Sequence, residues 1–215
     1  MPSLADVKAS NAHYAPSYVP TAVFVGGTSG IGQAMAQLLA RQTKGRANII
    51  LIGRNRAAAE KTIASFPAPP TEDGVTIQHE FIYCDASSLE NVHATSQSLL
   101  ERLDKINLLV LSLSRIGLRP VPTSEGLELT MILRYYARAK FVHELMPLLE
   151  SAHAKGEDAR VMSVLGAAMG GGRELERYGV EERMDGIEDG TPDWDFQRYH
   201  GQGLCGFESK RIMRT

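Results

Sequence analysis

Short runs rich in apolar residues alternate along the chain with segments that carry apolar residues on one helical face. The runs lie at residues 21–25, 48–52, 75–83, 106–113 and 160–165. The nearly continuous apolar character of the runs at 21–25, 48–52 and 106–113 is typical of parallel strands covered by helices on both faces. Helical periodicity between them predicts helices at residues 31–39, 56–65, 89–103 and 125–150.

This alternation predicts βαβ units and a parallel sheet. The fold class that follows is α/β, a Rossmann-like, doubly wound parallel sheet in a three-layer αβα arrangement, with at least five strands in the order 3-2-1-4-5. We expect an N-terminal extension at residues 1–20, a nucleotide-binding domain at 21–170 and an acidic, irregular tail at 171–215. From residue 173 onward the chain has seven basic and ten acidic residues and no sustained apolar period.

Composition and charge exclude several classes of protein. The chain is 43% hydrophobic and 22% charged with a net charge of −2, so it has no basic excess for nucleic acid. Residues 9–40 lack charged side chains, but the prolines and glycines among them argue against a membrane span. Cys84 and Cys205 match no metal-ligand spacing, which favours a reducing compartment. We expect a cytoplasmic protein without a metal site and without nucleic-acid or membrane partners.

A glycine-rich motif follows the first predicted strand and opens the first helix. It reads Val25-Gly26-Gly27-Thr28-Ser29-Gly30-Ile31-Gly32. Gly26 would permit the tight turn, Gly30 the approach of a pyrophosphate, and Gly32 the close packing of helix on strand. The free N–H groups and the dipole of the helix would then bind the phosphates. The alternative interpretation is a plain glycine turn.

The spacing Gly-x-x-x-Gly-Ile-Gly resembles the short-chain dehydrogenase/reductase family, over roughly residues 20–166. Gly53-Arg54-Asn55 stands where that family selects the adenosine ribose, and Cys84-Asp85-Ala86-Ser87 where it has an Asp beside the adenine. Ser124-Glu125-Gly126-Leu127 and Tyr135-Tyr136-Ala137-Arg138 resemble a divergent fungal branch often linked to secondary metabolism. The cofactor-binding residues that the resemblance implies are Gly26, Thr28, Ser29, Gly30, Ile31, Gly32, Arg54, Asn55, Asp85 and Ser112.

Arg54 bears on the choice of nicotinamide cofactor. An acidic residue at the end of the second strand would accept the ribose 2′-OH of NAD, whereas a guanidinium pairs with the 2′-phosphate of NADP. We therefore predict that NADPH is preferred over NADH. A solvated loop arginine is the alternative.

The resemblance also implies a catalytic Ser, a Tyr-x-x-x-Lys and an Asn, and this chain departs from that pattern. Ser163 is the hydroxyl nearest the expected Ser, and Tyr178 lies near the expected Tyr. The fourth residue after Tyr178 is Glu182 rather than Lys, and a carboxylate there would raise the pKa of the phenol. Tyr136 and Lys140 have the required spacing but lie between the fourth and fifth strands, so we favour an amphipathic helix with a snorkelling lysine. The catalytic candidates are Ser163 and Tyr178.

Two classes of function remain open. The first is an NADPH-dependent oxidoreductase that reduces a carbonyl, or oxidises an alcohol, of a small organic substrate, in secondary metabolism. The second is a catalytically defective or truncated NAD(P)-binding protein that acts as a sensor or partner subunit. The loss of pattern after residue 166 predicts a C-terminally truncated gene product, and the helix at 125–150 is the predicted surface of a homodimer.

Overall fold

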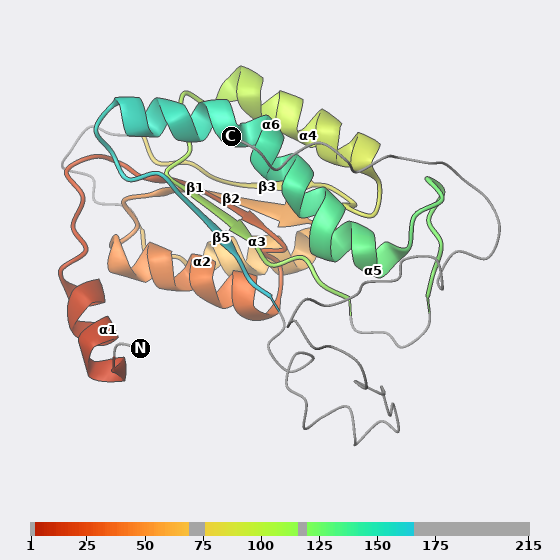
Figure 1. Ribbon diagram of the computed structural model, residues 1–215. Helices are drawn as coiled ribbons and strands as arrows, with labels where there is room; N and C mark the ends of the chain where they lie inside the picture. The colour runs from red at the N-terminus through yellow and green to blue at the C-terminus, as the bar shows by residue number, and fades with distance from the viewer. Residues whose placement is uncertain (1–2, 69–75, 116–119, 166–215) are drawn as a thin grey trace, which may run out of the picture. The chain divides into compact units, whose positions relative to one another are not determined.

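A computed structural model describes residues 3–68, 76–115 and 120–165. Its centre is a parallel sheet of five strands in the order β3-β2-β1-β4-β5 (Figure 1). The strands are β1 (Thr21–Val25), β2 (Asn48–Gly53), β3 (His79–Tyr83), β4 (Leu108–Leu111) and β5 (Arg160–Ser163). The predicted doubly wound, Rossmann-like topology is thereby confirmed.

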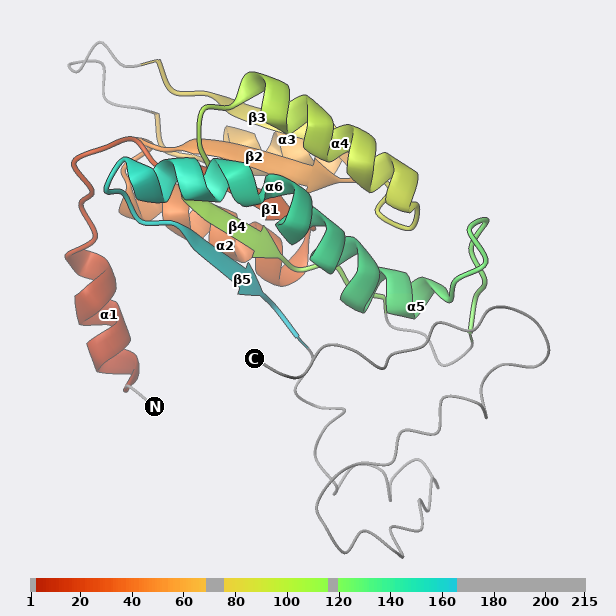
Figure 2. The ribbon, with the colours of Figure 1, turned by 45° about the horizontal axis from the view of Figure 1, so that its top comes forward.

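Helices cover the sheet on both faces and complete three layers (Figures 1 and 2). Helices α2 (Gly30–Gln42) and α3 (Arg56–Ala64) lie on one face, and α4 (Leu89–Arg102) and α6 (Ala137–Ala154) lie on the other. Strand β1 shows how the sequence fits this arrangement. Ala22 and Phe24 belong to the core on the α2 side, and Val23 and Val25 to the core on the α4 side. Because both faces of the strand are buried, apolar residues fill the four consecutive positions from Ala22 to Val25.

The last helix begins and ends about four residues later than predicted. Residues 125–128 precede it, and the helical stretch consists of α5 (Leu129–Met131), the π-helical turn η1 (Ile132–Tyr136) and α6. Glu128 caps its start, since the carboxylate accepts a hydrogen bond of 2.8 Å from the Met131 N–H. The preceding residues form a tight turn in which Gly126 N–H donates to the Thr123 carbonyl at 3.0 Å.

The predicted strands at 75–83, 106–113 and 160–165 are each longer than the observed ones. Backbone hydrogen bonds between β1 and the β4 segment continue one residue beyond β4 at each end, from the Asn107 N–H to the Thr21 carbonyl and from the Ser112 N–H to the Val25 carbonyl. Ile106 N–H donates to the Leu148 carbonyl of α6, and the hydroxyl of Ser112 turns toward the end of β1. The prediction of five strands in these places was right. The bounds of β1 match the prediction and those of β2 differ by one residue, whereas β3, β4 and β5 are shorter than predicted.

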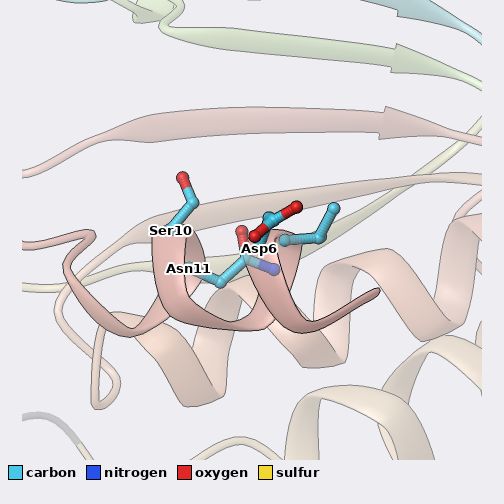
Figure 3. Close-up of a pocket in the computed structure, with 4 residues that line it drawn as sticks. Asp6, Ser10 and Asn11 are labelled. Carbon is cyan, nitrogen blue, oxygen red and sulfur yellow. The ribbon is translucent and has the colours of Figure 1, made fainter. Parts of the chain in front are cut away.

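Residues 3–20 contain a helix that the sequence pattern did not predict. Helix α1 (Leu4–Ala12) begins with a capping box, in which the Ser3 hydroxyl accepts from the Asp6 N–H and the Asp6 carboxylate accepts from the Ser3 N–H. Figure 3 shows Asp6, Ser10 and Asn11 beside an open pocket of about 280 Å³ on this helix. All the residues that line it come from α1, so it is separate from the glycine-rich loop. None of the helices within the described ranges is long and apolar enough to cross a lipid bilayer.

Candidate functional site

The carboxyl ends of β1, β2 and β4 meet at one edge of the sheet. Val25 at the end of β1 is in register with Ile52 of β2 on one side and Leu111 of β4 on the other. The strand order reverses between β1 and β4, and ligands of open α/β sheets bind in the crevice at such a switch point. The glycine-rich loop leaves β1 at this position.

The glycines of the loop have separate structural roles. Gly26 has a φ of +89°, a backbone conformation that favours glycine, and its N–H donates to the Ile52 carbonyl at 2.8 Å. A Cβ on Gly30, which has a φ of +57°, would meet no described atom within 4 Å. A Cβ on Gly32 would collide with the Ser112 hydroxyl and would lie 2.6 Å from the Gly26 carbonyl oxygen. The loop therefore has a turn, an open surface and a tight packing contact where the sequence predicted them.

Ser112 joins the loop to β4. Its hydroxyl donates to the Gly26 carbonyl at 3.1 Å, with the Val25 carbonyl at 3.3 Å. The hydroxyl thereby occupies the space that a Cβ on Gly32 would need. The contact of Ser112 with a cofactor stays a prediction, and what the structure establishes is its hold on the turn.

The first turn of α2 presents unpaired N–H groups. Ser29 occupies the N-cap position with extended backbone, but its side chain makes no capping hydrogen bond. The first N–H groups of a helix have no partner within the helix. Together with the open space at Gly30, they form a site that suits a phosphate. Thr28 lies beside Gly53 at the end of β2, and Ile31 is exposed, at 60%.

The end of β2 carries two arginines with different surroundings. Arg54 is exposed and makes no hydrogen bond or ion pair within the described part of the chain. Arg56 lies 5.1 Å from the ring centroid of Phe81 and 3.8 Å from the Glu60 carboxylate. Asn55, predicted to bind the cofactor, caps α3 by accepting a 3.0 Å hydrogen bond from the Ala58 N–H. Of these residues, Arg54 has the side chain that is free to contact a ligand.

The end of β3 is organised by short-range hydrogen bonds. Asp85 Oδ1 accepts from the Ser87 N–H at 3.1 Å, which leaves the second carboxylate oxygen without a described partner. Burial raises the pKa of the neighbouring Cys84 thiol, so this cysteine is a poor nucleophile.

Glu125 connects this end of the sheet with the segment after β4. Its Oε1 accepts hydrogen bonds from the Ser88 hydroxyl at 2.9 Å and from the Leu89 N–H at 2.8 Å. The carboxylate therefore caps α4, at the positive end of the helix dipole. No local pattern indicated this cap, because the partners are separated by 36 and 37 residues.

Ser163, the first catalytic candidate, lies at the end of β5 and is exposed. Its Oγ accepts a 2.6 Å hydrogen bond from Nη1 of Arg138 in α6. Tyr178, the second candidate, lies outside the described residues. The structure thus places Ser163 at the same sheet edge as Ser112 and the glycine-rich loop, in the neighbouring strand to β4.

Arg138 is a residue of the site that the sequence interpretation missed. It is only 5% exposed, and its guanidinium donates to the backbone carbonyls of Leu111, Leu113, Leu133 and Val164 as well as to Ser163. Burial lowers the pKa of Arg138, and the nearby Arg134 lowers it further. A signal was present in the sequence, since Arg138 interrupts an apolar stripe that continues at Phe141, Leu145 and Ala152.

Tyr136 and Lys140 have the spacing of the expected catalytic pair but a different environment. Lys140 Nζ forms an ion pair of 2.7 Å with Glu144, and the same carboxylate oxygen lies 3.0 Å from Nδ1 of His93 in α4. Lys140 is therefore engaged where α6 packs against α4, in agreement with an amphipathic helix.

Comparisons with known proteins agree with this geometry. The sequence profile described as short chain dehydrogenase matches residues 20–175. An oxidoreductase of Emericella nidulans is 37% identical over 167 residues, which are 77% of this chain and 47% of that protein. An oxidoreductase of Emericella variicolor is 33% identical over 166 residues, with the same shares of 77% and 47%. The chain thus spans about half the length of the curated relatives it matches.

Solved structures share the fold. A 3-ketoacyl-(acyl-carrier-protein) reductase from Brucella melitensis, complexed with NADH, has a TM-score of 0.54 at 22% identity, covering 72% of this chain and 60% of that one. RhlG from Pseudomonas aeruginosa, in an active-site complex with NADP, has a TM-score of 0.50 at 26% identity, covering 68% and 54%.

Proposed function

The chain belongs to the short chain dehydrogenase family, and on this premise we propose that it is an NADPH-dependent oxidoreductase that reduces a carbonyl, or oxidises an alcohol, of a small organic substrate. The observation that carries the proposal is the glycine-rich loop at the switch point of the sheet. Its uncapped helix N-terminus and the open space at Gly30 fit a dinucleotide pyrophosphate.

Arg54 supports the preference for NADPH. Its guanidinium stands at the end of β2, exposed and without a described partner, where the adenosine ribose of a bound dinucleotide would lie. A 2′-phosphate offers it a charge-assisted, bidentate hydrogen bond that the 2′-OH of NADH lacks. The RhlG complex contains NADP, although related folds with NAD or NADH also occur among the structural neighbours.

The chemistry assigns a simple role to Ser163. When bound, NADPH supplies a hydride. Ser163 would donate a hydrogen bond to the carbonyl oxygen of the substrate, which orients that carbonyl and stabilises the negative charge that develops on its oxygen. Tyr178 stays the predicted proton donor.

A nucleotide-binding protein without catalysis is the second candidate. It is favoured by the ion pair of Lys140 with Glu144, which holds the lysine of the Tyr-x-x-x-Lys sequence at the contact between α6 and α4. Titration of the protein with NADPH, followed by assay against a broad panel of ketones and aldehydes, separates the two functions. Binding with turnover supports the oxidoreductase, and binding without turnover supports the second candidate.

The cofactor proposal is tested by replacing Arg54 with Ala. We expect wild type to bind NADPH more tightly than NADH, and R54A to lose roughly tenfold or more in affinity for NADPH alone, because a hydrogen bond to a charged group contributes about 1.5–3 kcal/mol. Quenching or enhancement of cofactor fluorescence gives both dissociation constants. R56A is the matched control, since Arg56 packs over Phe81. An R54A protein that binds NADPH as tightly as wild type would refute the preference.

Three further predictions remain to be tested: a role in secondary metabolism, a cytoplasmic location, and a homodimer through residues 125–150. In the structure, α6 packs against α4, so part of the 125–150 segment is buried within the chain and cannot contact a second copy. Size-exclusion chromatography with light scattering would test the dimer.

A further inference from the structure

Arg138 holds a buried positive charge without a carboxylate partner in the described part of the chain. Instead, its guanidinium is surrounded by carbonyl oxygens at the ends of β4, β5 and η1 and by the Ser163 hydroxyl. We call Arg138 and these five acceptor residues the Arg138 clamp. The acceptors are Leu111, Leu113, Leu133, Ser163 and Val164.

The chemistry of the guanidinium determines how Ser163 can act. An arginine side chain has donors and no acceptor, so the Ser163 oxygen must accept the 2.6 Å hydrogen bond. The proton of the Ser163 hydroxyl therefore points away from Arg138, and no described residue accepts it. Ser163 is exposed at the carboxyl edge of the sheet, so this proton is available to a ligand. Accepting a hydrogen bond from a cation also makes the remaining O–H a stronger donor, because hydrogen bonds in a chain polarise one another.

We propose that Arg138 is a positioning residue that fixes the Ser163 hydroxyl as a hydrogen-bond donor toward the carbonyl oxygen of the substrate. This role rests on the proposed function, in which a carbonyl is reduced at this edge. Because Arg138 itself is only 5% exposed, it would act on the substrate through Ser163.

The shape of the side chain explains why the position holds Arg rather than Lys. The guanidinium reaches Leu111 at the end of β4 and Leu113 just after it, Ser163 at the end of β5 and Val164 just after it, and Leu133 in η1. An ammonium is a compact point charge and cannot hold so many separated acceptors in a fixed plane. Arg138→Lys would keep the charge and lose the geometry.

A thiol in place of the Ser163 hydroxyl tests the pairing without any need for turnover. In the full-length Ser163→Cys protein, the rate of alkylation of the introduced thiol by iodoacetamide is measured against pH, with peptide mass spectrometry to separate it from Cys84 and Cys205. Next to a guanidinium, we expect the half-maximal rate at or below about pH 7.5, against about pH 8.5 for an ordinary thiol. A midpoint at or above about pH 8.5 would overturn the proposal with this single variant.

Two added substitutions identify the source of the shift. Arg138→Met in the Ser163→Cys protein should return the midpoint toward about pH 8.5. Arg134→Met removes an equal charge four residues earlier, from an exposed side chain that makes no hydrogen bond within the described ranges, and should move the midpoint less. An equal effect of the two substitutions on the midpoint would mean that nearby positive charge alone lowers it. That result would contradict a specific contact between Arg138 and residue 163.

Turnover tests the functional part of the role. Arg138→Lys should lower kcat by roughly tenfold or more while the Kd for NADPH changes less than about twofold. In a Ser163→Ala background, Arg138→Lys should add less than about twofold, because the two residues act as a unit. If Arg138→Lys lowers kcat as much in the Ser163→Ala background as in wild type, Arg138 does not act through Ser163. Failure of wild type to bind NADPH or to reduce any carbonyl refutes the proposed function, whereas the alkylation midpoint of the Ser163→Cys protein decides the pairing independently.

Discussion

The glycine-rich loop after β1 and the Arg138 clamp at the ends of β4 and β5 hold the same edge of the sheet by opposite means. The loop depends on the absence of side chains, since a Cβ at Gly32 would collide with Ser112. The clamp depends on one long side chain that satisfies carbonyls from three elements. The loop should therefore be sensitive to added volume, and the clamp to the loss of a single group.

The largest effect in this comparison is expected from Gly32→Ala. The added methyl overpacks the contact with Ser112 and the Gly26 carbonyl, which typically costs about 1–3 kcal/mol and exceeds the gain in helix propensity of about 1 kcal/mol. Urea unfolding should show a clear loss of stability together with weaker NADPH binding.

Gly30→Ala is the matched control for that substitution. Space is open at Gly30, and the cost comes from its positive φ, at about 1–2 kcal/mol for a residue with a side chain. A methyl group there should weaken cofactor binding more than it weakens the fold. If both alanine variants lose binding and stability in the same proportion, the division of roles between the two glycines is wrong.

A smaller effect is expected from Glu125→Ala, which cuts the tie between the segment after β4 and the start of α4. Loss of the cap should cost about 1 kcal/mol. Glu101→Ala, at the other end of α4, removes a carboxylate from the negative end of the dipole and should leave stability within about 0.5 kcal/mol of wild type. Thermal unfolding of both variants makes the comparison. Equal losses would show that Glu125 does not act as a cap.

The smallest effect is expected in the pH dependence of stability. His79 in β3 should contribute to this dependence, and the Arg138 clamp should not. Burial lowers the pKa of His79 from 6.5, and both ring nitrogens are buried without a described partner. The unfolded chain therefore takes up a proton more readily than the folded one. Stability should be constant above pH 6.5 with respect to this group and should fall as the pH drops below 6.5. Arg138 stays charged throughout this range.

His79→Leu separates this contribution from that of the carboxylates. The variant should show a flatter stability profile between pH 6.5 and pH 4.5. Burial opposes ionisation of Glu144 and Glu157, but hydrogen bonds to their partners outweigh it and lower both pKa values. Their contribution is lost only as the pH falls below 4.5. An unchanged slope above pH 4.5 in His79→Leu would exclude His79 as its source.

The sequence predicted the parts of the site that depend on neighbouring residues. The glycine-rich loop lies within one short stretch, and its spacing already indicates a turn, an open surface and a packing contact. The sheet order likewise follows from the alternation of apolar runs with helices. Asn55 caps α3, as its position at the start of that helix favours, and its contact with a cofactor stays a prediction.

The parts that could not be predicted depend on partners far away in the chain. The end residues of the strand predicted at 106–113 have partners outside the sheet, since the Ile106 N–H donates to the Leu148 carbonyl and the Leu113 carbonyl accepts from Arg138. The helix predicted from residue 125 starts later, because Glu125 caps α4 instead. Arg138 could have been suspected as a charged residue in an apolar stripe, but its acceptors on the strand ends lie 25 to 27 residues away and no periodicity identifies them.

The clamp also imposes an order on the assembly of the molecule during synthesis. The contact of the Gly26 turn with β2 needs only the chain up to Gly53, whereas its contact with the Ser112 hydroxyl needs the chain through β4. The guanidinium of Arg138 has its full set of acceptors only after Val164 has left the ribosome. Until then, the positive charge stays in water, because burial without those carbonyls would be costly. Ser163 and Val164 therefore complete the acceptor set of a side chain that was synthesised 25 and 26 residues earlier.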